Sequence, residues 1–504
     1  MNTDFEMVAK TFQGLEGVLA EELRALGAKN VEPGKRMVAF SGDLAMLYKA
    51  NFCCRTALRI LKPFYTFDAA DPDELYAKVK EFDWGSLMSV TQTFAIDTVS
   101  FGEEFRHSQF VTYRVKDGIV DWFRDHLGDE SRPRVRLDGA DIMFNVHIAG
   151  RKVTLSLDSS GESLHKRGWR RSQTEAPINE VLAAGIILMT GWRGETPFVD
   201  PMCGSGTFLI EAAMIAAGIN PGLYRRHFAF ENWPDFNPEL LDEIYNDDSA
   251  ERSVTVPIVG ADISPRAIEI ARENAKNAGV ERYIKFDTKP ISQWNEAPQP
   301  AGVLVTNPPY GKRIGSDDMN ALYNSIGRTL KHTFTGYHCW IIGYEDVYFH
   351  EIGLAPSQKF AVNNGGLDCE LREYVIFDGK KADFRARGGA IKDRREQPQR
   401  ERGERGERRG SGRPDKRFAK RDERPQRSER PGTRFDKRDD RGAAGRFDDR
   451  PARNDERPDS RRPLRLDRIG RQPSIPADKT VVFNRPSWRV RKKDQDNNNN
   501  TDAK

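Results

Sequence analysis

The stretch FVDPMCGSGT, residues 198–207, passes from a short apolar strand through a glycine turn into a helix-forming segment at 208–216. Glycine has no Cβ, so Gly204 and Gly206 let the backbone come close to a ligand. The first N–H groups of the following helix have no partner within the helix and can face that ligand. A glycine turn alone is a weak signal, but this setting predicts a binding turn. The candidate contacts are Asp200, Pro201, Gly204, Ser205, Gly206 and Thr207.

A second strand ends in an acidic residue. The apolar run 256–261 leads to Asp262, and a Ser-Pro pair then begins a helix over 266–278. A carboxylate at such a strand end can hold the hydroxyl groups of a ribose. The interval from the glycine turn is far longer than the roughly twenty residues of a dinucleotide fold. Asp200 and Asp262 could instead cap the helices that follow them, but the accompanying glycine turn favours contact with a ligand.

The stretch Asn307-Pro308-Pro309-Tyr310-Gly311 follows the β-branched run 302–306, which predicts a buried strand. Proline has a fixed φ and no N–H, so the strand must end in a rigid loop. The Asn307 side-chain oxygen and the Pro308 carbonyl can accept the two N–H bonds of an exocyclic amine, while the Tyr310 ring stacks on the base. A structural turn is the alternative. The candidate catalytic residues are Asn307, Pro308, Pro309 and Tyr310.

The order of these segments is strand, glycine turn, helix, strand with terminal Asp, helix, strand and Asn-Pro-Pro-Tyr loop. This order predicts a doubly wound, Rossmann-like α/β domain. The chain resembles the class I S-adenosylmethionine-dependent methyltransferases that methylate amines. Over roughly residues 1–378 it more closely resembles the bacterial 23S rRNA guanine-N2 methyltransferase family, the RlmL-like N-terminal half of RlmKL. The matching runs are 108–110, 115–121, 164–170, 176–180, 200–207, 307–311 and 364–369.

The resemblance implies transfer of a methyl group from S-adenosylmethionine to the exocyclic N2 amine of a guanine in 23S rRNA. It implies that the glycine turn and Asp262 bind the cofactor and that the Asn307 loop receives the base. The N2 lone pair is delocalised into the ring, so we expect catalysis by positioning and local dipoles. The target base must leave its stack to reach the loop. The expected partner is 23S rRNA or a large-subunit assembly intermediate.

The resemblance also implies an order of domains. They are a ferredoxin-like segment at 1–60, a THUMP domain at 61–158, a basic linker at 159–175, a methyltransferase domain at 176–378 and a disordered tail at 379–504. Periodicity alone supports only a small α+β domain at the N-terminal side. Apolar stripes predict helices over 14–26 and 110–126, and alternation predicts an antiparallel hairpin over 142–157.

The net charge of +4 conceals two opposite parts. Residues 381–504 hold about 39 Lys and Arg against about 23 Asp and Glu, a net charge of about +16, which leaves about −12 on the rest. The tail has almost no aliphatic residues and cannot bury a core, which predicts disorder. We expect it to raise the affinity for RNA electrostatically, although its mixed charges could instead serve solubility. Any RNA surface on the acidic body must be a local patch.

The linker carries a basic cluster around Trp169. The cluster consists of Lys166, Arg167, Arg170 and Arg171. Cations beside an indole suit phosphate contact and stacking, so these four residues are candidate RNA contacts. Lys312 and Arg313, next to the Asn-Pro-Pro-Tyr loop, are candidates for the flanking phosphates. The alternative for both groups is a solvated charged segment, with the tryptophan packed between domains.

Cysteine usage and hydropathy give expectations about the compartment. The five cysteines show no paired Cys-x-x-Cys spacing, so we expect reduced thiols and no metal site. The sequence shows no signal-peptide pattern and no apolar run of membrane-spanning length. We therefore expect a cytoplasmic protein without a membrane partner.

Two departures from the family pattern limit what the resemblance implies. The acidic residue that contacts the adenine amine in relatives falls at Pro290, with Asp287 three positions earlier, so that contact stays open. Some relatives carry a second methyltransferase domain that makes 7-methylguanine. Here the tail takes its place, and we do not expect that activity.

Other functions use similar parts. Asn-Pro-Pro-Tyr loops also serve adenine-N6, cytosine-N4 and glutamine-amide methylation, but the N-terminal RNA-type module argues against DNA and protein substrates. A tRNA guanine-N2 methyltransferase is the nearest alternative, because such enzymes share both modules. A non-catalytic RNA-binding ribosome-assembly factor is the other. Intact Asp200, Gly204, Gly206, Asp262 and Asn307 argue against it.

Overall fold

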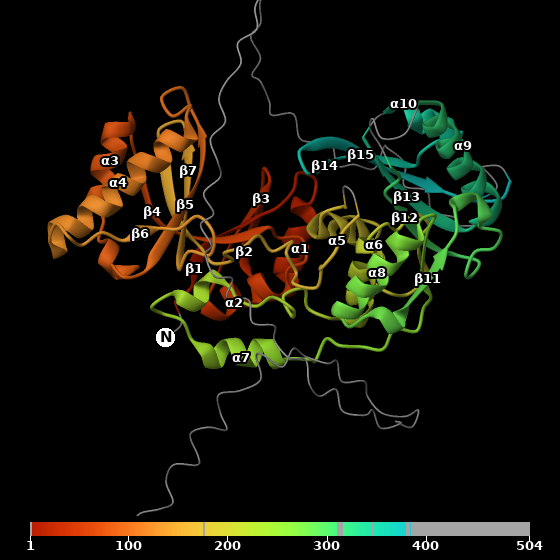
Figure 1. Ribbon diagram of the computed structural model, residues 1–504, viewed down its shortest axis with the longest axis horizontal. Coiled ribbons are helices and arrows are strands. Elements are labelled where there is room, and N and C mark those ends of the chain that lie inside the picture. Colours follow the sequence, from red (N-terminus) through yellow and green to blue (C-terminus); the bar gives the residue numbers. More distant parts are fainter. Residues whose placement is uncertain (1–2, 175–176, 310–315, 345, 380–383, 385–504) are drawn as a thin grey trace, which may run out of the picture. The chain divides into compact units, whose positions relative to one another are not determined.

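Two β-sheets organise the described part of the chain (Figure 1). This computed structural model describes residues 3–174, 177–309, 316–344, 346–379 and 384. The first sheet has eight strands in the order β2-β3-β1-β4-β8-β7-β5-β6. They are β1 (Phe5–Lys10), β2 (Lys29–Gly34), β3 (Met37–Gly42), β4 (Arg59–Asp68), β5 (Thr93–Phe101), β6 (Arg134–Val135), β7 (Ile142–Ala149) and β8 (Lys152–Asp158). The accompanying helices are α1 (Glu16–Ala25), α2 (Leu44–Cys53), α3 (Pro72–Glu81) and α4 (Ser108–Leu127).

The periodicity of the N-terminal region predicted its helices and hairpin, and these predictions are confirmed. Spacing by four places Leu15, Leu19 and Leu23 in the core along α1. The second predicted helix is α4. β7 and β8 form the predicted antiparallel hairpin, in which Phe144 lies opposite Leu157.

β4 joins the two N-terminal segments into one sheet. It begins at Arg59 and pairs antiparallel with β1 on one side and with β8 on the other. The domain boundary expected after residue 60 therefore falls inside a strand. A strand's own sequence does not show which neighbours it will pair with on its two edges.

The second sheet has the predicted doubly wound order, with one addition. Its order is β11-β10-β9-β12-β13-β15-β14. The strands are β9 (Phe198–Asp200), β10 (Ile258–Asp262), β11 (Ile284–Thr288), β12 (Gly302–Thr306), β13 (Tyr337–Gly343), β14 (Gln358–Asn364) and β15 (Leu367–Val375). The first five in this sheet order run parallel, and β15 is antiparallel to both β13 and β14. The helices are α5 (Glu180–Met189), α6 (Thr207–Ala217), α7 (Pro238–Asn246), α8 (Pro265–Asn277), α9 (Ser316–Thr333) and α10 (Asp346–Phe349).

Alternating side chains divide the second sheet between two cores. In β12, Val303 and Val305 belong to one buried cluster and Leu304 to the other. The first cluster includes the buried residues of α5, α6 and α8, whereas the second includes those of α9 (Figure 1). Both faces are therefore covered by helices, as a parallel sheet requires.

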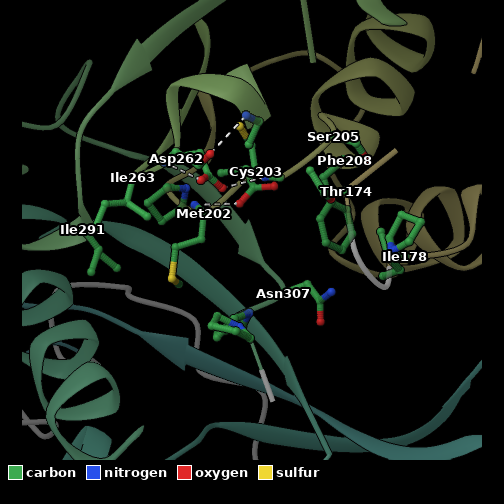
Figure 2. A pocket seen from close by; sticks show the side chains of 18 of the residues that line it. Thr174, Ile178, Met202, Cys203, Ser205, Phe208, Asp262, Ile263, Ile291 and Asn307 are labelled. Atoms are coloured by element: carbon green, nitrogen blue, oxygen red, sulfur yellow. Dashed lines mark hydrogen bonds between the residues drawn. The ribbon is translucent and has the colours of Figure 1, made fainter. Parts of the chain in front are cut away.

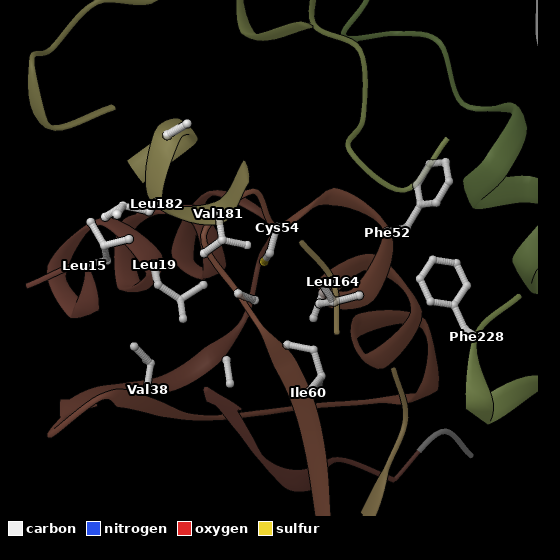
Figure 3. Close-up of a cluster of buried hydrophobic side chains, with 14 of the residues drawn as sticks. Leu15, Leu19, Val38, Phe52, Cys54, Ile60, Leu164, Val181, Leu182 and Phe228 are labelled. Atoms are coloured by element: carbon white, nitrogen blue, oxygen red, sulfur yellow. The ribbon is translucent and has the colours of Figure 1, made fainter. Parts of the chain in front are cut away.

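One of these cores continues into the N-terminal sheet (Figure 3). Leu15, which precedes α1, and Leu19 of α1 pack in the same cluster as Val181 and Leu182 of α5. Gly185 allows this approach, because a Cβ there would lie 2.5 Å from the Leu15 side chain. Since α5 also packs on α6, the apolar contacts connect the N-terminal sheet to the helix that follows the glycine turn.

Hydropathy along the helices is also informative. Within the described residues, no helix combines the length and the apolar character that crossing a membrane needs.

Candidate functional site

The ends of β9, β10 and β12 meet where the strand order reverses, which is the usual ligand crevice of an open α/β sheet. A cavity of about 930 Å³ opens there, and cavities of about 300–1,000 Å³ typically hold small ligands. Figure 2 shows the glycine turn, the end of β10 and Asn307 around this space. The predicted site residues that line it are Asp200, Pro201, Gly204, Ser205, Thr207, Asp262, Asn307, Pro308 and Pro309.

Asp262 is held in place by two backbone groups. Its Oδ2 atom accepts the N–H of Gly204 at 2.9 Å, and its Oδ1 atom accepts the N–H of Ser264 at 2.9 Å (Figure 2). The side chain is half-buried and lines the cavity. The carboxylate thus ties the glycine turn to the start of α8 and still presents oxygen lone pairs to a ligand.

Asp200 is buried beneath the same turn. Its Oδ1 atom accepts the N–H of Met202 at 3.2 Å and the hydroxyl of Thr306 at 2.9 Å. Burial raises the pKa of Asp200 to about 7, although these two hydrogen bonds oppose the shift. Thr306 was not among the predicted site residues. It precedes Asn307, so Asp200 also links the glycine turn to the Asn-Pro-Pro loop.

Gly206 makes the sharp entry into α6. Its φ of 83° lies in the left-handed region, and a Cβ there would lie 3.0 Å from the Cβ of Ala271 in α8. Gly206 is not itself part of the cavity lining. Its turn brings the first residues of α6, Thr207 and Phe208, to the cavity wall.

Arg170 holds the glycine turn from outside the cavity. Its Nη1 atom donates to the Ser205 hydroxyl at 2.9 Å, and its Nη2 atom donates to the Thr207 hydroxyl at 2.8 Å. Its Nε atom donates to Glu180 of α5 at 2.6 Å. The guanidinium also lies over the Trp169 ring, 4.9 Å from its centroid. Arg170 is 16% exposed, and its Nε, Nη1 and Nη2 atoms each donate within the protein, which argues against the expectation that it serves as a phosphate contact.

The rest of the basic linker divides between interior and surface. Arg167 is 2% exposed and forms an ion pair with the fully buried Glu211 at 3.3 Å, so it is not available to RNA, which corrects that expectation. Trp169 is buried, as the packing alternative expected. Lys166 and Arg171 are exposed, and Lys166 contacts Glu162 at the surface.

The Asn-Pro-Pro loop contributes a polar atom without a partner. The Oδ1 atom of Asn307 is buried and accepts no hydrogen bond from any described residue. A buried amide oxygen left in this state costs about 1–3 kcal/mol, so the site suits a ligand that brings a donor. Pro308 and Pro309 lie beside it in the cavity wall. The remaining predicted residues of this region, Tyr310, Lys312 and Arg313, lie outside the described residues.

An apolar wall that the sequence reading missed borders Asp262. Ile263 is 71% exposed and lines the cavity together with Pro290 and Ile291 (Figure 2). Such side chains offer a flat apolar contact to a base. Asp287 is not in the lining and lies 3.4 Å from the Lys289 ammonium. The only available signal was an isoleucine at a predicted strand end, which most often packs in the core.

Metal binding needs several His, Cys, Asp or Glu side chains that lie close together. In the described ranges of the chain, no group of three or more His, Cys, Asp or Glu residues lies close enough together for that purpose.

Three protein-family profiles match consecutive parts of the chain. The profile of an RlmL ferredoxin-like domain matches residues 6–61, that of a THUMP domain matches 69–158, and that of an RMKL-like methyltransferase domain matches 167–373. "Putative RNA methyltransferase slr0064" of Synechocystis sp. is 38% identical over 372 residues, which cover 73% of this chain and 96% of that protein.

A second relative is longer than the matched region. "Ribosomal RNA large subunit methyltransferase K/L" of Syntrophotalea carbinolica is 37% identical over 389 residues, which cover 75% of this chain. The match covers 54% of that protein, so this chain spans about half its length.

Solved structures show the same architecture. SMU.472, described as a putative methyltransferase complexed with SAH, superposes with a TM-score of 0.67 at 30% identity, covering 75% of this chain and all of that one (100%). A "possible methylase" from Clostridium difficile 630 gives a TM-score of 0.68 at 30% identity with the same coverage, 75% and 100%. TrmN from Thermus thermophilus, at 18% identity and a TM-score of 0.53, shares the fold.

Proposed function

Because this chain belongs to the RMKL-like methyltransferase family with a THUMP domain, we propose that it methylates the exocyclic N2 amine of a guanine in 23S rRNA. The methyl donor is S-adenosylmethionine. The substrate in the cell is 23S rRNA or a large-subunit assembly intermediate, and the compartment is the cytoplasm. The family supports methyl transfer to RNA, and the geometry of the Asn307 loop supports an amine as the acceptor.

The residues around the cavity fit the cofactor. When bound, S-adenosylmethionine supplies an electrophilic methyl group on its sulfonium sulfur. Asp262, fixed by Gly204 and Ser264, offers carboxylate oxygens for ribose hydroxyls. Ile263 and Ile291 offer the apolar wall for the adenine. The solved relative SMU.472 was crystallised with SAH, which agrees with this assignment.

The Asn307 loop suits an amine that is a poor nucleophile. The N2 lone pair of guanine is delocalised into the ring, which makes the amine a poor nucleophile. The protein therefore needs to orient the amine, and no strongly basic side chain is required. Asn307 Oδ1 and the Pro308 carbonyl are the acceptors that we assign to the two N–H bonds. Accepting both would turn the lone pair toward the cofactor cavity, and fixed dipoles would stabilise the developing charge. The extra proton leaves after transfer.

The unpartnered, buried Oδ1 atom of Asn307 is the observation that carries this proposal. We expect Asn307→Ala to lose methyl transfer to RNA while keeping its affinity for SAH, because the cofactor contacts lie on β9, β10 and α6. Isothermal titration calorimetry with SAH and an assay with labelled cofactor measure the two properties separately. Full activity of a folded Asn307→Ala protein would remove the assignment.

Asp262→Ala is the matched variant for the cofactor. Losing a charged hydrogen-bond partner should weaken cofactor binding by about 1–3 kcal/mol. An Asp262→Ala protein that folds and binds SAH as tightly as the wild type would contradict the cofactor assignment, whatever the RNA product. If the wild-type protein binds neither S-adenosylmethionine nor SAH, the non-catalytic assembly factor would be favoured.

A further inference from the structure

A second groove lies next to the cofactor cavity. Its volume is about 1070 Å³, and it shares Pro177 and Ile178 with the lining of the cofactor cavity. Elsewhere its walls include the linker 160–171, the segment 224–227 before α7, and the loop 137–140 after β6. A polymer bound in the groove could therefore extend one of its monomers past Pro177 and Ile178 into the cofactor cavity, toward Asn307.

The groove is positively charged on a body that is acidic as a whole. Seven Lys and Arg residues and three Asp and Glu residues line it, whereas residues 1–380 carry a net charge of about −12. An excess of one sign along a concave surface attracts a polymer of the opposite sign. The occupant should thus be a polyanion.

Four of these seven cations are occupied within the protein. Arg59 pairs with Asp158, Arg167 with Glu211, and Arg170 with Glu180. Arg225 donates to the backbone carbonyls of residues 160, 162, 163 and 166. These arginines build the wall and contribute positive potential, but much of their hydrogen bonding is directed into the protein rather than toward the groove.

The remaining cations face solvent. Lys166 forms an exposed pair with Glu162, which a phosphate can replace at little cost. Arg171 and Arg226 are exposed, and their guanidinium groups have no hydrogen-bond or ion-pair partner among the described residues. Asp138 is the exposed acidic residue on the opposite wall. Arg171 and Arg226 are therefore the groups best placed to contact phosphates.

We propose that this groove binds the single-stranded RNA segment next to the target nucleotide, with Arg171 and Arg226 on its phosphates. The proposal deepens the proposed function and rests on it. A base that enters the cofactor cavity must be unstacked and unpaired, so the adjoining nucleotides should be single-stranded. The groove would hold these nucleotides while Pro177 and Ile178 mark the entry of the target base.

Charge reversal tests the groove in the full-length chain. In Arg171→Glu/Arg226→Glu, affinity for a fluorescein-labelled single-stranded RNA of mixed sequence should fall about tenfold or more at low salt. The dependence of log Kd on log salt should become shallower by roughly one to two. Fluorescence anisotropy across a salt series gives both values. Calorimetry with SAH should give wild-type affinity, which also shows that the variant is folded.

Lys276→Glu/Lys331→Glu is the matched control, because both lysines are exposed and line neither cavity. An equal loss in both double variants, or no loss in the groove variant, would overturn the proposal. If the groove variant fails to fold, Arg226→Gln should show a smaller loss of RNA affinity in the same direction, and unchanged affinity would again overturn the proposal.

The wild-type protein should bind the single-stranded RNA more tightly than the corresponding duplex, and equal affinity would contradict the single-stranded assignment. A methylated product other than N2-methylguanosine, with RNA binding still dependent on the groove, would remove the proposed function but not the groove.

Discussion

Arg170 joins the glycine turn to α5 with one side chain. It contacts Glu180, Ser205 and Thr207, and it is largely buried. Planar guanidinium donors suit such a fixed arrangement, whereas a lysine has a single flexible charged end. We infer that Arg170 is a positioning residue for the glycine turn and does not itself contact the cofactor, because it is absent from the cavity lining.

The first prediction is that Arg170→Met weakens SAH binding by about 1–3 kcal/mol, because the turn loses its charged donor. Arg170→Lys should recover part of the loss. Calorimetry measures both affinities, and Arg171→Met, whose side chain is exposed, is the neighbouring control. If Arg170→Met and Arg171→Met bind SAH equally well, the positioning role is wrong.

Asp200 predicts a pH dependence of stability. Burial raises its pKa from 3.8 to about 7, so the folded protein keeps a proton that the unfolded chain has lost between these values. The free energy of unfolding should therefore fall as pH rises through this window and then level off. Asp200→Asn should remove that contribution. Urea unfolding of both proteins from about pH 4 to about pH 8 measures the difference, and identical pH profiles would contradict it.

At the residue scale, the sequence predicted which residues line the cavity better than it predicted which linker arginines are exposed. Asp200, Asp262 and Asn307 follow strands, and parallel strands bring their ends together whatever the rest of the chain does. Arg167, Arg170 and Arg171 look alike in sequence. Their different positions depend on Glu211 and Glu180, which lie on helices whose placement only the folded chain determines.

At the scale of elements, the sequence predicted the strands and helices that carry strong periodicity or glycine and proline signals. It did not predict that β15 would insert between β13 and β14 in the opposite direction, or that β4 would join two domains into one sheet. The Gly365-Gly366 turn between β14 and β15 is a local hairpin signal, but the pairing of β15 with β13, and of β4 with β1 and β8, joins segments far apart in the chain and leaves no local pattern.

The linker is held against the segment before α7 by a very close backbone approach. Gly168 has a φ of +97°, and a Cβ there would lie 2.1 Å from the carbonyl oxygen of Tyr224. Gly128, with a φ of +98°, has open space at the same place. An alanine at position 128 would therefore introduce backbone strain alone, whereas an alanine at position 168 would add a steric clash.

We predict that Gly128→Ala costs about 1–3 kcal/mol of stability, from its positive-φ, extended backbone alone. Gly168→Ala should cost clearly more, because it must also push the linker away from Tyr224. Urea denaturation compares the two variants directly. Equal losses would show that the contact between the linker and Tyr224 is loose.

At the scale of the whole molecule, a buried ion pair connects the linker to α6. Arg167 and Glu211 are both inaccessible to solvent, and burial raises the pKa of Glu211. The adjacent pair of Lys166 and Glu162 lies at the surface. The tail, by contrast, lies outside the described residues apart from 379 and 384, so its role in binding RNA stays a prediction from composition.

We expect Arg167→Met to destabilise the protein by about 3–5 kcal/mol, because it leaves the Glu211 charge buried with less compensation. Lys166→Met should cost less than about 1 kcal/mol, as exposed pairs usually do. Chemical denaturation of the two neighbouring variants measures the contrast. Similar small losses would mean that water reaches Glu211 and that the pair does not hold the parts together.

The central claim is methyl transfer to the N2 amine of guanine in 23S rRNA. The most direct test incubates the purified full-length protein and isotope-labelled S-adenosylmethionine with rRNA and tRNA from a strain that lacks the gene. The RNA is then digested, and its nucleosides are identified by mass spectrometry. The proposed function predicts label in N2-methylguanosine from 23S rRNA, and none with Asn307→Ala. Label in N6-methyladenosine, or in tRNA alone, would contradict it.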